Sequence, residues 1–277
     1  MSLQGFNSKL DQYEIEERIG QGSQNTVYAA RHKVSGLHVA IKTIKTPTYK
    51  RLTREQHVSE AVAHYTLCRH SDYVLKFVEA FTEGSLTYIV TKLAQSGDLL
   101  NHLGNRNDPC LSEDEARRMF VQLVRGVRDM HENGIVHRDL KHLNIFISGT
   151  SAKPKVRIGD FGLSVKLSPK ENYYIKKQSG TLGYMAPEII KNEPSDFKAD
   201  IWSLGVLLYS FISADMPFEG SNEQETRQAI VNQELVFKDP AWSEVSYELK
   251  DLIHGMLYKN QHYRLSIAEV RMHPWLS

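Results

Sequence analysis

One change of local pattern, near Leu93, most constrains how this chain of 277 residues can fold. Before Leu93, five short segments are rich in Val, Ile, Tyr and Thr, the composition typical of strands: 13–19, 26–31, 37–44, 73–81 and 86–91. Between the third and the fourth, residues 51–69 carry apolar side chains at helical spacing. After Leu93 helical spacing dominates. The sequence therefore predicts an α+β protein, in which a small antiparallel sheet with one helix precedes a larger helical part.

The helical part contains clear helix-start signals. Ser112 and Glu115 form a capping box ahead of apolar residues that repeat on one helix face. Ser266 and Glu269 form a second capping box near the end of the chain. Further helices are predicted at 198–214, 223–232 and 247–258. The most apolar run, 201–214, is too short to span a bilayer, so we interpret it as a buried helix.

Composition argues against several kinds of partner. Lys plus Arg number 34 and Asp plus Glu 33, so no overall charge attracts the chain to nucleic acid or an anionic membrane. Cys68 and Cys110 lack the spacing of a disulfide framework or zinc site, which favours a reducing compartment, cytoplasmic or nuclear. The 12 histidines lack zinc-site spacing, so any metal is expected to have oxygen ligands. Residues 1–12 are polar, without the apolar core of a signal peptide, and are predicted to be a flexible tail.

The segment 137–144 carries three different functional groups within eight residues. Asp139 supplies a carboxylate, Lys141 an ammonium group and Asn144 a carboxamide. The segment has no helical apolar period, so we predict a curved loop that can aim all three groups at one point. Beyond it, apolar runs at 145–147 and 156–158 predict a hairpin that returns Asp160 to the side of Asn144. Such a set can handle a proton, a phosphate and a divalent cation, although a polar loop without function is the simpler alternative.

A second group of chemically distinctive residues lies in the predicted sheet. Gly20 and Gly22, between the first two strands, can bring backbone N–H groups close to a phosphate, although tight hairpins use the same pair. Lys42 interrupts an apolar strand and therefore needs an anionic partner. The following helix offers Glu55 and Glu60, of which Glu60 lies closer to the apolar stripe.

Five motifs in order make the chain resemble the eukaryotic protein kinase family: Gly20-x-Gly22, Val-Ala-Ile-Lys at 39–42, His-Arg-Asp-Leu-Lys-His-Leu-Asn at 137–144, Asp-Phe-Gly at 160–162 and Ala-Pro-Glu at 186–188. The resemblance implies a two-lobed kinase fold, with a tail at 1–12 and a kinase domain at 13–277. It divides the domain into an N-lobe at 13–91, a hinge at 92–96 and a C-lobe at 97–277. The implied activity is transfer of the γ-phosphoryl group of Mg-ATP to hydroxyl groups of protein substrates.

The resemblance also implies a role for individual residues. In the reaction, Asp139 would take the proton of the acceptor hydroxyl, Lys141 would neutralise charge on the phosphoryl group, and Lys42 would hold phosphates while paired with Glu60. The implied nucleotide-binding residues are Gly20 and Gly22 over the phosphates, Val27, Ala40 and Phe146 around adenine, Thr91 as gatekeeper, Lys92 and Ala94 at the hinge, and Asp98 at the rim, with Asp160 reaching the phosphates through Mg²⁺. The implied Mg²⁺ ligands are Asn144 and Asp160.

Supporting residues follow from the same resemblance. Lys141 with Gly180-Thr181 is similar to the serine/threonine-specific pattern, and Thr181 is expected to bond to Asp139 and Lys141. Asp200 is expected to anchor the backbone of the loop at 137–144. In the same way, Arg264 is expected to be the buried partner of Glu188.

The chain departs from the family pattern at three positions. Asn25 replaces the third glycine of the phosphate loop. His142 stands where the family usually has proline, and Leu143 where members that prefer basic substrates often carry glutamate; both are predicted to influence substrate choice. Local similarity to Wee-like kinases, which phosphorylate tyrosine, keeps a tyrosine or dual-specificity kinase open as an alternative. A nucleotide-binding pseudokinase is the non-enzyme alternative, although Lys42, Asp139 and Asp160 are all present.

Control by phosphorylation is suggested by Arg138, which precedes Asp139 and invites an anionic partner. The position that the family most often phosphorylates is Lys177, which cannot accept phosphate. The remaining acceptors are Ser168, Tyr173, Tyr174 and Ser179, so an upstream activating kinase is a predicted partner, unless activation needs no phosphate. We predict a monomer that acts on protein substrates.

Overall fold

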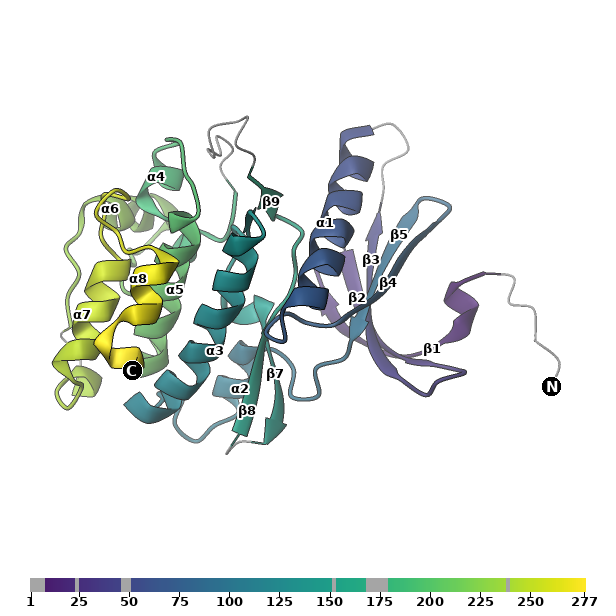
Figure 1. Ribbon diagram of the computed structural model, residues 1–277, viewed down its shortest axis with the longest axis horizontal. Coiled ribbons are helices and arrows are strands. Elements are labelled where there is room, and N and C mark those ends of the chain that lie inside the picture. Colours follow the sequence, from purple (N-terminus) through teal and green to yellow (C-terminus); the bar gives the residue numbers. More distant parts are fainter. Residues whose placement is uncertain (1–7, 23–24, 46–50, 151–152, 168–178, 238–239) are drawn as a thin grey trace.

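The computed structural model describes residues 8–22, 25–45, 51–150, 153–167, 179–237 and 240–277, and at 51–59 it describes the backbone alone. The elements divide between its two ends (Figure 1). The sheet and one helix lie at one end, and the remaining helices lie at the other. This arrangement agrees with the predicted change of pattern near Leu93.

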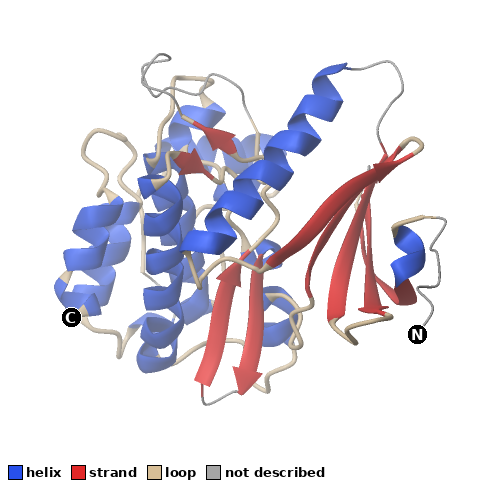
Figure 2. Ribbon diagram, turned by 45° about the vertical axis from the view of Figure 1, so that its right-hand side comes forward, coloured by secondary structure: helices blue, strands red, loops and turns tan. Residues whose placement is uncertain are grey.

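The five predicted strands form one antiparallel sheet in the order β1-β2-β3-β5-β4. Their bounds are β1 (Tyr13–Gln21), β2 (Asn25–His32), β3 (His38–Lys45), β4 (Phe77–Glu83) and β5 (Leu86–Lys92). The helix α1 (Arg51–His70) lies between this sheet and the helical end (Figures 1 and 2). Strand β3, which carries Lys42, is the middle strand of the sheet.

The helical end is built around two long helices, α3 (Glu113–Glu132) and α5 (Lys198–Ser213). The others are α2 (Leu99–Gly104), α4 (Pro187–Ile190), α6 (Glu223–Asn232), α7 (Tyr247–Met256) and α8 (Ile267–Met272). Strands β7 (Ile145–Thr150) and β8 (Lys153–Ile158) form the predicted hairpin, and β6 (Ile135–Val136) pairs with β9 (Val165–Lys166). Both predicted capping boxes are present, at Ser112 and at Ser266.

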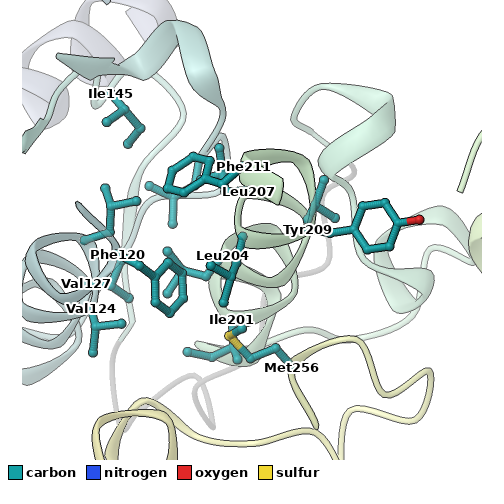
Figure 3. Close-up of a cluster of buried hydrophobic side chains, with 14 of the residues drawn as sticks. Phe120, Val124, Val127, Ile145, Ile201, Leu204, Leu207, Tyr209, Phe211 and Met256 are labelled. Carbon is teal, nitrogen blue, oxygen red and sulfur yellow. The ribbon is translucent and has the colours of Figure 1, made fainter. Parts of the chain in front are cut away.

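The main core fills the space between α3, α5 and α7 (Figure 3). Its centre contains Phe120, Val124 and Val127 from α3, Ile201, Leu204, Leu207 and Phe211 from α5, and Met256 from α7. Each such side chain contributes roughly 1.5–3 kcal/mol by leaving water. The run predicted as a buried helix is therefore the centre of the helical end. No helix in the described part of the chain is long and apolar enough to cross a membrane.

Two local predictions need correction. Within the predicted tail, Ser8 Oγ and Lys9 N both donate to the Glu83 carboxylate, at 2.8 and 2.7 Å, and a 3-10 turn follows at Leu10–Gln12. The strand predicted from residue 73 begins at Phe77, because Val74 bridges to Ile158 of the β7–β8 hairpin instead. The curved loop predicted at 137–144 is present, and it ends in one 3-10 turn, His142–Asn144.

Candidate active site

Asp200 holds the backbone of the loop that carries Asp139. Its two carboxylate oxygens accept the N–H groups of His137 and Arg138, both at 2.9 Å, and His131 Nε2 lies 3.0 Å from Oδ2. Burial alone would raise the pKa of Asp200, but the hydrogen bonds and charge of these histidines lower it below its ordinary value. The carboxylate is thus kept ionised while fully buried. The predicted anchoring role is confirmed.

This anchor also accounts for an unusual backbone conformation. Arg138 has a φ of 70°, in the left-handed region that costs a non-glycine residue of order 1–3 kcal/mol. Such a conformation persists only where the surroundings enforce it, and here the bond from Arg138 N to Asp200 does so. The strained residue turns the chain immediately before Asp139.

Three donors orient the Asp139 carboxylate. Thr181 Oγ1 donates to Oδ1 at 2.8 Å, while Lys141 Nζ and Asn144 Nδ2 lie 2.7 and 3.0 Å from Oδ2. Lys141 Nζ also donates to Thr181 Oγ1 at 2.7 Å. The expected bonds from Thr181 to both residues are therefore present. Together they place a carboxylate, an ammonium group and a hydroxyl at one point.

Lys42 lies between two carboxylates from distant parts of the chain. Its Nζ is 2.8 Å from Glu60 Oε1 on α1 and 2.8 Å from Asp160 Oδ1. Burial would lower the pKa of Lys42, but the charges of Asp160 and Glu60 outweigh it and raise the pKa above its ordinary value. Lys42 therefore stays charged, and Glu60 is its partner on α1. The side chain of Glu55, the alternative partner, lies outside the described residues.

Asn144 and Asp160 suit a hard divalent cation by the chemistry of their donors. Asn144 Nδ2 donates to the Asp139 backbone oxygen at 2.8 Å as well as to its carboxylate, which leaves the amide oxygen for another partner. Lys42 and Gly162 both contact Oδ1 of Asp160, so Oδ2 has no donor among the described residues. Amide and carboxylate oxygens are ligands that Mg²⁺ accepts.

A cation at this place would need further oxygen ligands. No group of three or more His, Cys, Asp or Glu side chains is arranged to hold a metal ion within the ranges that the structure describes. Mg²⁺ is often bound through one or two protein ligands together with substrate phosphates and water. The pair Asn144 and Asp160 fits that kind of site.

Several of the predicted nucleotide-binding residues share one face of the sheet. Val27 lies opposite Lys42, and Ala40 lies opposite Thr91, on neighbouring antiparallel strands. Opposite residues point to the same face, and alternate residues on β3 do too, so all four side chains lie on the Lys42 face. Phe146, on β7, bridges to Asp98 at the edge of the helical end.

The predicted hinge and the glycine pair also belong to the described residues. Lys92 N donates to Lys76 O at 2.8 Å, which ties the end of β5 to the residue that precedes β4, and Ala94 follows two residues later. Neither Gly20 nor Gly22 has a positive φ, so positive φ is not the reason for glycine here. At Gly22, a Cβ atom would lie 2.8 Å from Asn25 Oδ1. A residue larger than glycine at position 22 would therefore collide with the Asn25 side chain.

Asp98 has a second task that the sequence did not reveal. It is the N-cap of α2, where its carboxylate accepts the Asn101 N–H at 2.9 Å and the Asn101 side-chain amide at 2.8 Å. A contact with ribose or with a basic residue of a substrate remains a prediction.

Glu188 and Arg264 form the predicted buried pair. The guanidinium donates to both carboxylate oxygens, at 2.7 and 2.8 Å, and their side chains are 3% and 0% exposed. Arg264 also donates to the backbone oxygens of Lys198 and Tyr258. This pair ties the segment 186–188 to the stretch of chain between α7 and α8.

Sequence reasoning missed how three histidines are packed. His131 supports Asp200, and His64 lies 4.8 Å from Phe161 between ring centroids. A signal for His64 existed, since it follows Glu60 by one helical turn and so shares its helix face. His142 and Leu143, both predicted to influence substrate choice, differ in exposure: His142 is buried, with 7% exposed, whereas Leu143 is 49% exposed.

Among the candidate phosphate acceptors, Ser179 alone belongs to the described residues. Its hydroxyl accepts a hydrogen bond from the Arg138 guanidinium. Ser168, Tyr173 and Tyr174 lie outside the described residues, as does Lys177.

Comparison with known proteins decides the family. Residues 13–276 match the protein kinase domain. The chain belongs to this family. The kinase domain is 33% identical to a probable myosin light chain kinase of Dictyostelium discoideum, over 98% of this chain and 68% of that protein. It is 34% identical to sperm motility kinase 2B of Mus musculus, over 96% and 52%, and 32% identical to serine/threonine-protein kinase ATG1a of Arabidopsis thaliana, over 95% and 41%.

The comparisons confirm the predicted kinase domain and its α+β fold. The chain spans about half the length of several of these relatives, and 1% of a titin homolog of Caenorhabditis elegans that it matches at 32% identity. None of the proteins named here is a Wee-like kinase, so they give no support to the tyrosine-specific alternative.

Proposed function

We propose that this kinase domain transfers the γ-phosphoryl group of ATP to serine and threonine hydroxyls of protein substrates. One observation carries the proposal: Asp139, Lys141 and Thr181 are bonded to one another, with Asn144 bonded to the same Asp139 carboxylate. The named relatives include a serine/threonine-protein kinase, which supports the same acceptor class.

The roles of the residues follow from their positions. Asp139, held by three donors, would orient the acceptor hydroxyl and take its proton. Lys141 would balance negative charge on the transferred group, and Lys42, kept charged by two carboxylates, would bind the other phosphates. Asn144 and Asp160 would hold Mg²⁺, which when bound neutralises phosphate charge. The glycines at 20 and 22 would cover the phosphates.

The adenine site would use the Lys42 face of the sheet. Val27 and Ala40 would contact one side of the base and Phe146 the other, with Thr91 at the back. The Lys92 carbonyl and Ala94 N–H would bond to the base edge, and Asp98 would lie at the rim. The proposed site therefore lies between the sheet and the β7–β8 hairpin.

The test is phosphate transfer from Mg-ATP to a peptide library, with the natural chain compared with Asp160→Asn. We expect serine and threonine peptides to be labelled and the variant to lose roughly a hundredfold or more of the rate. Asp72→Asn, the same change on a side chain that is 89% exposed, is the matched control and should keep the rate. Labelling of tyrosine would favour the Wee-like alternative. Equal nucleotide binding without transfer by either protein would favour a pseudokinase.

We also propose that phosphorylation of Ser179 strengthens the active arrangement. Its hydroxyl already contacts the Arg138 guanidinium, so a phosphate there would meet a positive charge beside the loop at 137–144, which we call the catalytic loop. Either an upstream kinase or a second copy of this chain would add it. Intact-mass measurement before and after incubation with Mg-ATP, followed by site mapping, tests the idea. Full activity without a phosphate on Ser179 would contradict it.

For the location we propose the cytoplasm or the nucleus. Cys68 and Cys110 lack the spacing of a disulfide framework or a zinc site, which favours a reducing compartment. We propose further that the domain acts as a monomer on protein substrates, without nucleic acid. Sedimentation of the purified chain and microscopy of a tagged one check these two points.

A further inference from the structure

His142 connects the catalytic loop to two other parts of the helical end. Its Nδ1 lies 2.7 Å from Tyr184 Oη, in the segment after Thr181, and its Nε2 lies 3.0 Å from Ser210 Oγ on α5. The imidazole also packs edge-on against the rings of Tyr184 and Phe211, with centroids 5.9 and 6.1 Å apart. A proline at this position could make neither polar contact.

The hydrogen positions in this network follow from Ser210. Its hydroxyl donates to Leu207 O at 2.8 Å, so Ser210 Oγ is the acceptor for His142 Nε2–H. A neutral imidazole then has an unprotonated Nδ1, which accepts the Tyr184 hydroxyl proton. The result is a continuous chain of donors from Tyr184 through His142 and Ser210 into α5.

Tyr184 closes the short 3-10 turn Leu182–Tyr184, which starts next to Thr181. At the start of this segment, Thr181 is bonded to Asp139 and Lys141. At its end, Tyr184 is bonded through its side chain to His142, and its backbone oxygen accepts the Ser203 hydroxyl at 2.9 Å. The segment is therefore attached to the catalytic loop at both ends.

We propose that His142 is a positioning residue that holds Tyr184, and with it the segment 181–184, in register with Asp139. This inference rests on the proposed function, because the register matters only where a substrate hydroxyl must meet the Asp139 carboxylate. Thr181 contacts that carboxylate, so a shift of the segment moves a group beside the reacting oxygen. Displacements of about 1 Å can cost roughly a hundredfold in rate.

The experiment compares His142→Leu, Tyr184→Phe and the double variant in phosphate transfer from Mg-ATP to a serine peptide. We expect kcat/KM for the peptide to fall roughly tenfold to a hundredfold in each single variant, while KM for ATP stays within about twofold. In the double variant, kcat/KM for the peptide should lie within about twofold of its value in the less active single variant, since the two residues act through one bond. His142→Asn, which keeps an acceptor near the Nδ1 position, should recover part of the loss.

Tyr209→Phe is the matched control. It removes a tyrosine hydroxyl that donates to Val236 O at 3.1 Å, on the same helix as Ser210 but directed elsewhere, and it should leave the peptide kcat/KM unchanged. Tyr184→Phe removes one atom only, so it keeps the test open if His142→Leu does not fold. The proposal would be overturned if KM for ATP changed by as large a factor as kcat/KM for the peptide. It would also be overturned if the losses of the two single variants multiplied in the double variant. A natural chain that transfers no phosphate would instead overturn the proposed function.

Discussion

Two sets of paired charges in this kinase domain differ in what surrounds them. Lys42, Glu60 and Asp160 form an open cluster between the sheet and the helical end, with side chains that are 16%, 6% and 40% exposed. Glu188 and Arg264 form a closed pair, with 3% and 0% exposed and further bonds from the guanidinium to backbone oxygens. Both sets join segments that are distant in the sequence.

The difference teaches what each set can do. In the closed pair, both carboxylate oxygens are used by one guanidinium, so no group remains for a ligand. In the open cluster, one Lys42 ammonium serves two carboxylates, and Asp160 keeps an oxygen without a donor among the described residues. Removing a member of the closed pair should therefore affect stability, whereas removing a member of the open cluster should affect chemistry.

The largest expected effect is at Lys42. In Lys42→Met, loss of the ammonium group should lower kcat/KM for phosphate transfer by roughly 10²–10³-fold, because a fixed positive charge near the phosphates is removed. Lys191→Met, the same change on an exposed side chain with no role in the proposed site, is the control for kcat. A Lys42→Met protein that keeps full activity would remove the distinction between the two sets.

At the closed pair the loss should appear in stability. Arg264→Met leaves Glu188 buried without its partner, which costs about 3–5 kcal/mol in the free energy of unfolding. The kcat per folded molecule should stay within about twofold. Urea unfolding, together with kinetics corrected for the folded fraction, measures both quantities. Adding Glu188→Gln to Arg264→Met should recover part of the lost stability. If Arg264→Met lowered kcat without lowering stability, the comparison of the closed pair with the open cluster would be contradicted.

A smaller effect is expected on the pH dependence of stability, through His64 near the open cluster. Burial lowers the pKa of His64 from 6.5 to about 4, partly opposed by its bond to Leu75 O. Between these two pH values, His64 binds a proton in the unfolded chain but not in the folded chain. The free energy of unfolding therefore rises with pH across that window. Between pH 5 and pH 7 the natural chain should gain about 2 kcal/mol relative to His64→Leu. Thermal or urea unfolding of both proteins at the two pH values measures the gain, and parallel pH profiles would contradict it.

The smallest effect is expected at a helix cap distant from both charge sets. Ser112→Ala removes the side chain that accepts the Glu115 N–H and should cost about 1 kcal/mol of stability, without a change in kcat. Urea unfolding and steady-state kinetics check the two parts. A drop in kcat here would show that general loosening of the helical end, rather than the open cluster alone, controls activity.

Much of the fold was predictable because its signals are local. Strand composition, the two capping boxes and the apolar run of α5 depend on neighbouring residues, and the structure has them within a few residues of the predicted bounds. The exceptions involve distant partners: Val74 bridges to Ile158 rather than extending β4, and Ser8 and Lys9 are held by Glu83. No local pattern carries that information.

The sequence by itself determined which chemical groups this protein has and which motifs contain them, including Lys42, Asp139, Asn144 and Asp160. Only the tertiary structure decided how those groups are paired. It buried His142, which the sequence linked only to substrate choice, and it bonded Asp200 to a loop more than 60 residues away. The physical reason is that a side chain's type is local, whereas its burial and its hydrogen-bond partners depend on which distant elements pack against it.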